Sequence, residues 1–272
     1  RLSANNKKGE YYLTDVIGLA SEDGTFIDSV KPQTTEEIFG VNDKTQLAEA
    51  EKHKRKQAAD RLLQDGVTLA DPERIDVRGE LVCGKDVFID VNVVFEGNVK
   101  ISEGSSIGPH SVISNSTIGK HTKILSHCNL EHAIVGDDCS VGPFARLRPG
   151  TELMDSAKAG NFVEIKKSQI GQQSKVNHLS YVGDAVVGKE VNIGAGTITC
   201  NYDGANKHQT IIEDNVFIGS GVELVAPVAV KEGATIGAGS TITKQTPKNK
   251  LTLERARQKT IPNWKRPIKK TT

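Results

Sequence analysis

Residues 77–113 read VRGELVCGKDVFIDVNVVFEGNVKISEGSSIGPHSVI, and every sixth residue of this stretch is apolar. These positions are Val77, Cys83, Ile89, Phe95, Ile101, Ile107 and Ile113. After one step of five residues the spacing resumes at Ile118, Ile124 and Leu130, and after another at Val135, Val141, Leu147 and Leu153. It returns at Ile212, Ile218, Leu224, Val230, Ile236 and Ile242. A period of six residues is therefore the main regularity of the chain.

This period predicts β structure rather than helix. Six is not a multiple of 3.6 but is a multiple of two, so each sixth side chain points to the same side of an extended chain. Three sides of six residues would close a coil of about 18 residues, and stacked coils would pair as parallel strands ~4.8 Å apart. We predict that residues 66–243 form a parallel β-helix filled by the apolar positions. Glycines after these positions, such as Gly108, Gly142, Gly194 and Gly237, are expected at corners that need positive φ.

The pattern is interrupted twice. The spacing is lost from Met154 to Gly160, and residues 200–210 are polar and typical of a loop. Insertions in a solenoid form loops on one face, which is often the binding face. We therefore expect loops at both segments.

The composition supports a thin, repetitive β protein. Hydrophobic residues make up 36% of the 272 residues and aromatic residues only 4%, while glycine occurs 26 times. This profile favours short strands over a bulky core. The 35 basic and 34 acidic side chains leave a net charge of +1. That balance excludes a protein steered as a whole towards nucleic acid or a membrane surface.

The cysteines and the lack of long apolar runs indicate the cellular compartment expected for the protein. Cys83, Cys128, Cys139 and Cys200 form no Cys-x-x-Cys pair. A reduced, cytoplasmic protein is therefore expected. No apolar run is long enough to cross a membrane, so no membrane insertion is expected.

The two ends lack the six-residue spacing. Residues 45–65 are rich in alanine and straight-chain side chains, which predicts a linker helix between an Asp43 N-cap and a stop at Gly66. Residues 1–44 are expected to be the end of an upstream domain, and the first residue, Arg1, indicates a fragment. Residues 244–272 hold ten basic side chains and one acid, Glu254. Such a basic tail could bind a phosphate-bearing ligand or nucleic acid, or simply be solvated.

Polar side chains gather in the central coils. Arg148 and Lys166 are 18 residues apart, so they could stack on one side of the β-helix and grip a phosphate. Glu164 and His178 are 14 apart and could meet across a corner. A histidine with a carboxylate partner is the usual general base near neutral pH. The alternative is that these are ordinary charged residues on a solvent-facing surface.

Three longer motifs carry a resemblance to a known family. They are GPFARLRPG at residues 142–150, GNFVE at 160–164 and NIGAGTITCNYDG at 192–204. The chain resembles the bacterial bifunctional N-acetylglucosamine-1-phosphate uridyltransferase/glucosamine-1-phosphate acetyltransferases over essentially its whole length. The resemblance implies a left-handed parallel β-helix, preceded by a linker helix and a fragment of an α/β nucleotidyltransferase domain. It also implies a homotrimer whose acetyltransferase site lies between subunits.

The resemblance assigns roles by position. His178 matches the family's catalytic base, and Glu164 matches a residue that orients it. The matches to sugar-phosphate contacts are Arg148, Lys166, Tyr181 and Asn192, with Lys207 in the active-site loop. The matches to acetyl-CoA contacts are Ala195, Asn201, Tyr202, Ser220, Ala238 and Arg255. Asn42 matches a residue that helps to hold Mg²⁺ in the uridyltransferase site.

The implied reaction is acetyl transfer from acetyl-CoA to the amine of glucosamine 1-phosphate. The resemblance implies that the intact protein also converts the product to UDP-N-acetylglucosamine for peptidoglycan and lipopolysaccharide synthesis. The family's glycine-rich nucleotide loop and metal-binding aspartate are not among these 272 residues. We therefore expect this chain to acetylate glucosamine 1-phosphate but not to make the UDP-sugar. Nucleic acid is not an expected partner.

Two other classes of function remain open from the sequence. A γ-class carbonic anhydrase binds zinc through histidines of adjacent coils, and His121, His127 and His132 are candidates for such a triad. A scaffold without enzymatic activity is the other class. Metal analysis separates the two enzymes, and acetyl-CoA turnover separates an enzyme from a scaffold.

Overall fold

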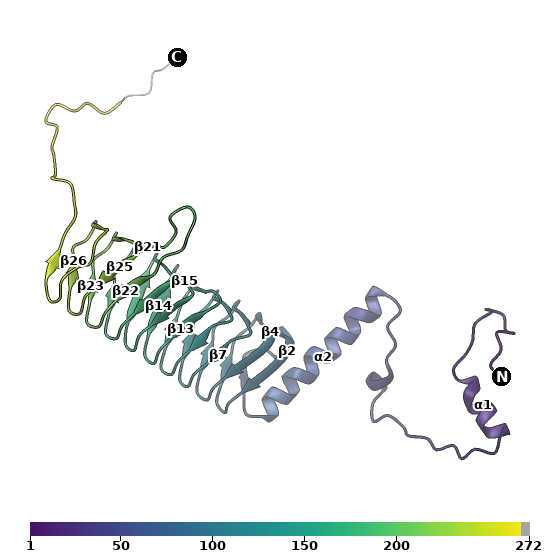
Figure 1. Cartoon of the computed structure of the whole chain (residues 1–272). Helices are drawn as coiled ribbons and strands as arrows, with labels where there is room; N and C mark the ends of the chain where they lie inside the picture. Colours follow the sequence, from purple (N-terminus) through teal and green to yellow (C-terminus); the bar gives the residue numbers. More distant parts are fainter. Residues whose placement is uncertain (268–272) are drawn as a thin grey trace. The chain divides into compact units, whose positions relative to one another are not determined.

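The structure is a computed structural model that describes residues 1–267 (Figure 1). The chain divides into two compact units, one from residue 1 to residue 53 and one from residue 54 onward. Each unit is described by itself.

The second unit is a parallel β-helix with three sides, each a ladder of short strands (Figure 1). Side 1 consists of β1 (Thr68–Leu69), β3 (Phe88–Ile89), β5 (Ser106–Ile107), β8 (Lys123–Ile124), β11 (Ser140–Val141), β14 (Lys158–Asn161), β17 (Lys175–His178), β20 (Asn192–Ile193), β23 (Phe217–Ile218), β26 (Thr235–Ile236) and β28 (Leu251–Thr252). Side 2 consists of β6 (Val112–Ser114), β9 (Asn129–Glu131), β12 (Arg146–Leu147), β15 (Glu164–Lys166), β18 (Tyr181–Gly183), β21 (Ile198–Cys200), β24 (Glu223–Val225) and β27 (Thr241–Ile242). Side 3 consists of β7 (Thr117–Ile118), β10 (Ile134–Val135), β13 (Thr151–Leu153), β16 (Ser168–Ile170), β19 (Ala185–Val187), β22 (Thr210–Ile212) and β25 (Val228–Val230).

The first coils differ slightly from the rest. The short 3₁₀ helix η2 (Pro72–Arg74) precedes β2 (Ile75–Cys83), and β2 pairs in parallel with β4 (Val93–Ile101) over nine residues. Because β4 then pairs with both β6 and β7, these two long strands run through sides 2 and 3 without a break.

The predicted interior is confirmed with two exceptions. From Ile89 onward, all of the apolar sixth positions named above are buried. Val77 and Cys83 are only partly buried, because their strand β2 lies in the first coil and has a ladder partner only in β4. Burial nevertheless raises the pKa of the Cys83 thiol to about 12.

Of the two predicted interruptions of the six-residue spacing, the first is wrong and the second is confirmed. Ala159 is fully buried, and its strand β14 pairs with β11 and β17, so the six-residue spacing runs on from Leu153 through Ala159 to Ile165. A small alanine concealed the repeat. At the second site, β21 ends at Cys200 and β22 begins only at Thr210. The residues between them form the loop that projects beside β21 in Figure 1.

Most of the glycines named after the apolar positions are not explained by a positive φ, which was the expected reason. Gly142 has the expected positive φ of 98°, but Gly108, Gly194 and Gly237 do not have a positive φ. A Cβ on Gly194 would lie 2.6 Å from the backbone carbon of Gly219 in the next coil. Close approach of the next coil's backbone therefore requires glycine at positions 108 and 194, whereas a Cβ on Gly237 would meet the side chain of Leu253. The corners themselves mostly use other residues with positive φ.

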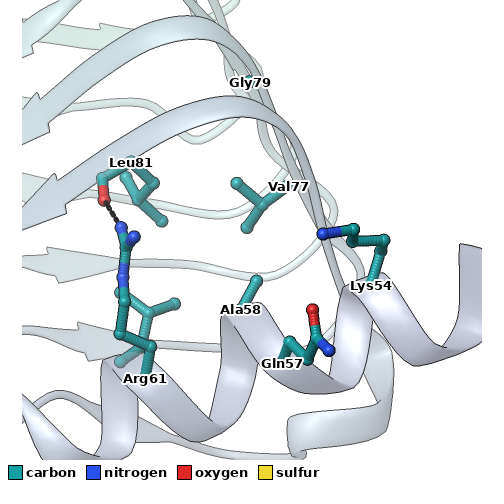
Figure 2. Close-up of a pocket in the computed structure, with 8 residues that line it drawn as sticks. Lys54, Gln57, Ala58, Arg61, Val77, Gly79 and Leu81 are labelled. Carbon is teal, nitrogen blue, oxygen red and sulfur yellow. Dashed lines mark hydrogen bonds between the residues drawn. The ribbon is translucent and has the colours of Figure 1, made fainter. Parts of the chain in front are cut away.

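Helix α2 (Lys44–Gln64) begins and ends one residue before the predicted helix. The side chain of Asp43 accepts a hydrogen bond from the backbone N–H of Gln46 at 2.8 Å, as expected of an N-cap. Ala59 and Leu62 are the buried residues of this helix. Beside it lies a hollow of about 370 Å³, where Arg61 donates to the carbonyl oxygen of Leu81 at 3.2 Å (Figure 2).

The first unit contains α1 (Asp15–Glu22) and η1 (Thr35–Ile38) and no strand. None of residues 1–53 is buried, and Phe26 and Val30 are 87% and 93% exposed. At the other end, the ladder continues to Thr252, beyond the expected limit at residue 243. Residues 253–267 form no helix or strand, and residues 268–272 of the predicted tail lie outside the described part of the chain.

Candidate functional site

The corner between sides 1 and 2 brings several predicted site residues into one row. The backbone N–H of Gly196 donates to the carbonyl of His178 at 3.1 Å. Gly221 donates in the same way to Ala195 at 2.7 Å, and Gly239 donates to Ser220 at 2.8 Å. His178, Ala195, Ser220 and Ala238 therefore follow one another in successive coils, each one residue before the corner. The predicted base and three predicted acetyl-CoA contacts share one edge of the β-helix.

The corner residues between sides 1 and 2 have bulky side chains up to the coil of His178 and are glycines after it. Before it, Phe144 and Phe162 stack with their ring centroids 5.1 Å apart, and in the coil of His178 itself the corner residue Leu179 is 64% exposed. After it, the corner positions are Gly196, Gly221 and Gly239, all with positive φ. A Cβ on Gly196 or Gly221 would meet nothing closer than 3.8 Å. This part of the edge is therefore open, and the Arg255 side chain lies 3.8 Å from the same position on Gly239.

His178 is exposed, and its partner is Asn161 rather than Glu164. Nδ1 of His178 contacts Oδ1 of Asn161, which occupies the same position one coil earlier. An amide oxygen can only accept, so Nδ1–H is the donor and Nε2 keeps a free lone pair. The sequence analysis assigned no role to Asn161. The signal was available, because Asn161 precedes His178 by one coil in the quoted GNFVE motif.

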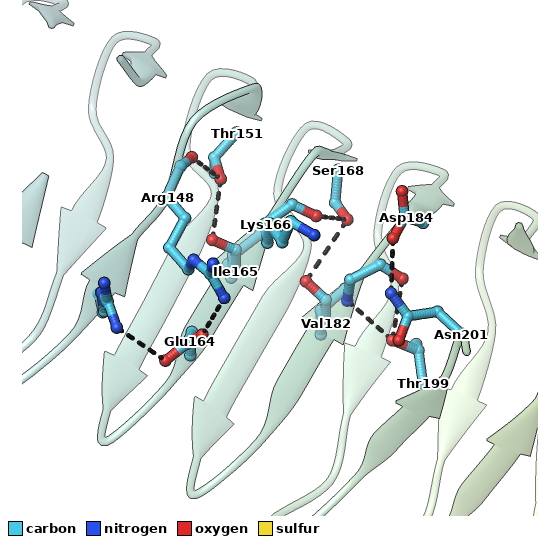
Figure 3. A network of polar contacts seen from close by, with 12 residues as sticks. Arg148, Thr151, Glu164, Ile165, Lys166, Ser168, Val182, Asp184, Thr199 and Asn201 are labelled. Carbon is cyan, nitrogen blue, oxygen red and sulfur yellow. Dashed lines mark hydrogen bonds and ion pairs between the residues drawn. The ribbon is translucent and has the colours of Figure 1, made fainter. Parts of the chain in front are cut away.

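Glu164 binds arginine instead. Oε1 accepts from Nη1 of Arg148 at 2.9 Å, and Oε2 lies 3.7 Å from Nη1 of Arg146 (Figure 3). The expected contact between Glu164 and His178 does not occur within residues 1–267, because Glu164 points outward from side 2 whereas His178 lies at the corner. Glu164 therefore fixes Arg148 in this chain.

Two lysines meet where side 2 ends. The pKa of Lys207 is lowered, first because the side chain of Lys166 lies nearby and its positive charge repels that of Lys207. Asp184 and Tyr181 also lie close enough to oppose this shift. The loop after β21 thus brings Lys207 to Lys166, and Figure 3 shows Lys166 on the same side as Arg148. Three cations therefore flank one surface of side 2.

The base of the loop is fixed by buried polar contacts. Asn201 is 8% exposed, and its Nδ2 donates to Oδ2 of Asp184 at 2.5 Å (Figure 3). Asp184 is also 3.7 Å from Nζ of Lys167. A Cβ on Gly183 would lie 2.4 Å from the hydroxyl of Tyr181, so this hydroxyl rests on the glycine beside Asn201. Tyr202, the next predicted contact, is 60% exposed.

Asn192 lies apart from the predicted sugar-phosphate contacts. It belongs to β20 on side 1, where its side chain contacts Asn177 at 3.4 Å. Arg148, Lys166 and Tyr181 lie on side 2. The structure therefore distributes the predicted substrate site over two sides that diverge from the corner at His178.

The alternative zinc triad is not assembled in this chain. His121, His127 and His132 have positive φ and occupy three different corners, because about one side of a coil separates each from the next. Among the described residues, no group of three or more histidine, cysteine, aspartate or glutamate side chains could hold a metal ion. A carbonic anhydrase site built from these three residues of one chain is therefore wrong.

Asn42 does not make a magnesium site by itself. It is exposed and its backbone N–H donates to Gln46 at 2.7 Å, with no cluster of carboxylates around it in the described chain. Mg²⁺ prefers several oxygen ligands in octahedral geometry. The residues present here do not fit that ion.

No helix within residues 1–267 is long and apolar enough to cross a membrane. Cys83, Cys128, Cys139 and Cys200 are free thiols.

Comparisons with known proteins relate the chain to a family. Residues 77–159 match the GMPPB C-terminal domain, and residues 209–244 match the bacterial transferase hexapeptide family of six repeats. The bifunctional protein GlmU of Ralstonia pickettii is 59% identical over 98% of this chain and 59% of its own length. GlmU of Cupriavidus pinatubonensis is 57% identical over 99% of this chain and 59% of its own length. The chain therefore spans less than two thirds of these relatives.

Among solved structures, the UDP-N-acetylglucosamine acyltransferase of Arabidopsis aligns with a TM-score of 0.47 and 17% identity, covering 64% of this chain and 68% of that chain. The predicted family resemblance is confirmed by the relatives at 57% and 59% identity, and the predicted hexapeptide-repeat β-helix is confirmed by the parallel ladders and by the hexapeptide match at residues 209–244.

Proposed function

We propose, on the premise that this chain is a homologue of the bifunctional GlmU proteins over nearly its whole length, that it transfers acetyl from acetyl-CoA to the amine of glucosamine 1-phosphate. The observation that carries the proposal is the row of His178, Ala195, Ser220 and Ala238 along one open edge. This row puts a general base at the end of a surface suited to a long, thin cosubstrate.

His178 is the proposed base because its Nε2 is free. Nδ1–H is held by Asn161, which fixes both the tautomer and the ring. As the amine nitrogen attacks the thioester carbonyl, its proton passes to Nε2 and a C–N bond forms. The C–S bond then breaks, and the proton moves from His178 to the departing sulfur of coenzyme A. No covalent enzyme intermediate is needed.

The sugar phosphate is proposed to bind on side 2. Arg148 is held by Glu164, while the charges of Lys166 and Lys207 lie close enough for Lys166 to lower the pKa of Lys207. Like charges in contact are unfavourable unless an anion lies between or beside them. A phosphate placed there would form charge-assisted hydrogen bonds with all three cations. Tyr181 lies between these cations and the corner of His178, where it can contact the sugar.

Acetyl-CoA is proposed to lie along the open edge beyond His178. Gly196, Gly221 and Gly239 have no side chain to block it, and Ala195, Ser220 and Ala238 line the row. Arg255 stands beside Gly239, where it can bind a phosphate of the coenzyme. Asn201 and Tyr202 are proposed to contact the coenzyme from the loop, although the amide nitrogen of Asn201 is already bound to Asp184.

A second copy of the chain is proposed to complete the site. Asn192 on side 1 and the cations on side 2 point away from each other in one chain, so one small sugar cannot touch both. Side 1 of one copy facing side 2 of another would bring them together. Repetition of such a contact forms a ring when the rotation between copies closes, and a ring of three copies is the homotrimer that we propose.

The first unit is proposed to be the end of a uridyltransferase domain. Its exposed apolar side chains, such as Phe26 and Val30, indicate a segment that needs a larger domain to cover them. UDP-N-acetylglucosamine synthesis with Mg²⁺ is a proposal for the whole protein, and no step of it is derived from Asn42. Action in the cytoplasm is part of the proposal, and four free thiols suit that compartment.

The test uses the purified chain with acetyl-CoA and glucosamine 1-phosphate. Release of the coenzyme A thiol and mass-spectrometric identification of N-acetylglucosamine 1-phosphate are expected together. Glucosamine without phosphate is the matched substrate, and we expect much slower turnover because the three cations have no anion to bind. Thiol release that is equal for both substrates, or no release at all, would contradict the proposal.

A further inference from the structure

The loop between β21 and β22 is a small hairpin with its own hydrogen bonds. Tyr202 and Lys207 form an antiparallel bridge. The backbone N–H of Asp203 donates to the carbonyl of Asn206 at 3.1 Å, and that of His208 donates to Asn201 at 2.8 Å. The hairpin therefore has a defined shape although most of its residues are exposed.

Asp203 is the centre of this hairpin. Its Oδ1 accepts from the backbone N–H groups of Ala205 at 2.8 Å and Asn206 at 2.6 Å. Its Oδ2 lies 2.6 Å from Nε2 of His208, on the opposite strand of the hairpin. The backbone donor of Asn206, then His208 and Ala205, hold the pKa of Asp203 well below its usual range. The Asp203 carboxylate thus links the tip of the hairpin to both of its strands.

The bonds of Asp203 fix two residues of the proposed site. Lys207 directly precedes His208, and its pKa is lowered by the nearby charge of Lys166. Tyr202 directly precedes Asp203, and its hydroxyl donates to the carbonyl of Gly204 at 2.6 Å. Two nearby cations repel each other, so internal bonds of the loop help to hold Lys207 near Lys166. Asp203 and His208 supply them.

We propose that Asp203 and His208 are positioning residues, which clasp the hairpin so that Lys207 and Tyr202 are ordered before the substrates bind. This inference rests on the proposed function, because it assigns Lys207 and Tyr202 to substrate binding. The clasp touches neither substrate. It removes the entropy cost of ordering the loop from each binding event.

A positioning role affects binding and catalysis differently. His178 and Asn161 belong to the coils and do not depend on the hairpin. Removing the contacts of Asp203 and His208 therefore raises KM for both substrates and leaves kcat nearly unchanged. Loss of charge-assisted hydrogen bonds of this kind corresponds to an increase in KM of about tenfold.

The experiment compares two pairs of variants with the wild-type chain. Asp203→Ala and His208→Ala should raise KM about tenfold, with kcat changed by less than about twofold. Asp203→Asn keeps an oxygen for the two backbone N–H groups, and His208→Gln keeps a donor for Asp203. Both conservative variants should recover most of the affinity. Unchanged KM in both alanine variants would overturn the proposal, as would an equal loss in the conservative variants.

Asp214→Ala is the matched control. Asp214 also accepts from a backbone N–H, that of Lys189 at 2.9 Å, and its carboxylate lies 3.9 Å from the Lys189 ammonium group. It lies at the corner between sides 3 and 1, away from the hairpin. We expect the KM values of the Asp214→Ala variant for both substrates to match those of the wild-type chain. An increase equal to that of Asp203→Ala would show a general effect on the β-helix and overturn the proposal.

Hydrogen exchange separates this inference from the proposed function. The amides of Ala205 and Asn206 should exchange faster in Asp203→Ala, while those of β21 and β22 stay protected. If the wild-type chain shows no acetyl transfer but this change occurs, the proposed function is wrong and the clasp stands as a structural feature without a positioning role. If transfer occurs and exchange is unchanged, the clasp is wrong.

Discussion

At the scale of single residues, the site depends on which partner each polar side chain finds. The pairing of Arg148 and Lys166 on one side follows from their separation by one coil, and the sequence predicts it correctly. The partner of His178 does not follow in that way. Glu164 and Asn161 are both near in sequence, and only the direction of each side chain decides that Asn161 reaches the ring.

Replacing His178 by alanine tests the proposed base. We expect kcat for acetyl transfer to fall about 10²–10⁴-fold, the usual range for loss of a general base. Thermal unfolding should stay at the wild-type temperature, because His178 is exposed and fills no part of the core. Turnover close to the wild-type rate in a folded variant would exclude His178 as the base.

Asn161→Ala tests the tautomer argument. Without the acceptor at Nδ1, the ring is no longer fixed with Nε2 free, so we expect kcat to fall about tenfold and by less than in the His178 variant. Asn161→Asp keeps an acceptor and should retain more activity than the alanine variant. Equal activity of Asn161→Ala and wild type in steady-state kinetics would show that the contact has no catalytic role.

At the scale of elements, the six-residue period specifies the β-helix almost completely. It predicts the buried positions from Ile89 onward and the loop after Cys200. It fails at Ala159, because alanine is too small to mark an apolar position. It also fails at Val77, because burial at the end of a ladder depends on neighbouring elements that a period does not describe.

The reason for glycine after the buried apolar positions can be tested with Gly108→Ala. The new Cβ would lie 2.8 Å from the backbone carbon of Leu125, so one coil must shift. We expect a loss of about 1–3 kcal/mol in the free energy of unfolding, as for other overpacked sites.

Gln173→Gly is the control for that substitution. Gln173 is an exposed corner residue with a φ of 60°, a conformation that glycine adopts easily. Urea or thermal unfolding should therefore show little change. If Gly108→Ala is as stable as the control, close approach of the coils does not explain these glycines.

At the scale of the whole molecule, we propose that one β-helix does not contain a complete site. A convex corner carries His178, and the predicted substrate contacts lie on both sides of it. The sequence predicts which residues belong to the site through the family resemblance. It does not predict that they lie on diverging sides, because that depends on the assignment of each strand to a ladder.

The most direct test of this account is to mix two inactive variants. Arg148→Ala removes a side 2 contact and Asn192→Ala removes a side 1 contact, so each variant should have low kcat/KM for glucosamine 1-phosphate. If the site joins side 1 of one copy to side 2 of the next, random mixed trimers should contain about one quarter intact sites. We therefore predict that unfolding and refolding the two variants together restores about a quarter of the wild-type kcat/KM. A mixture no more active than its parents would contradict a site shared between copies.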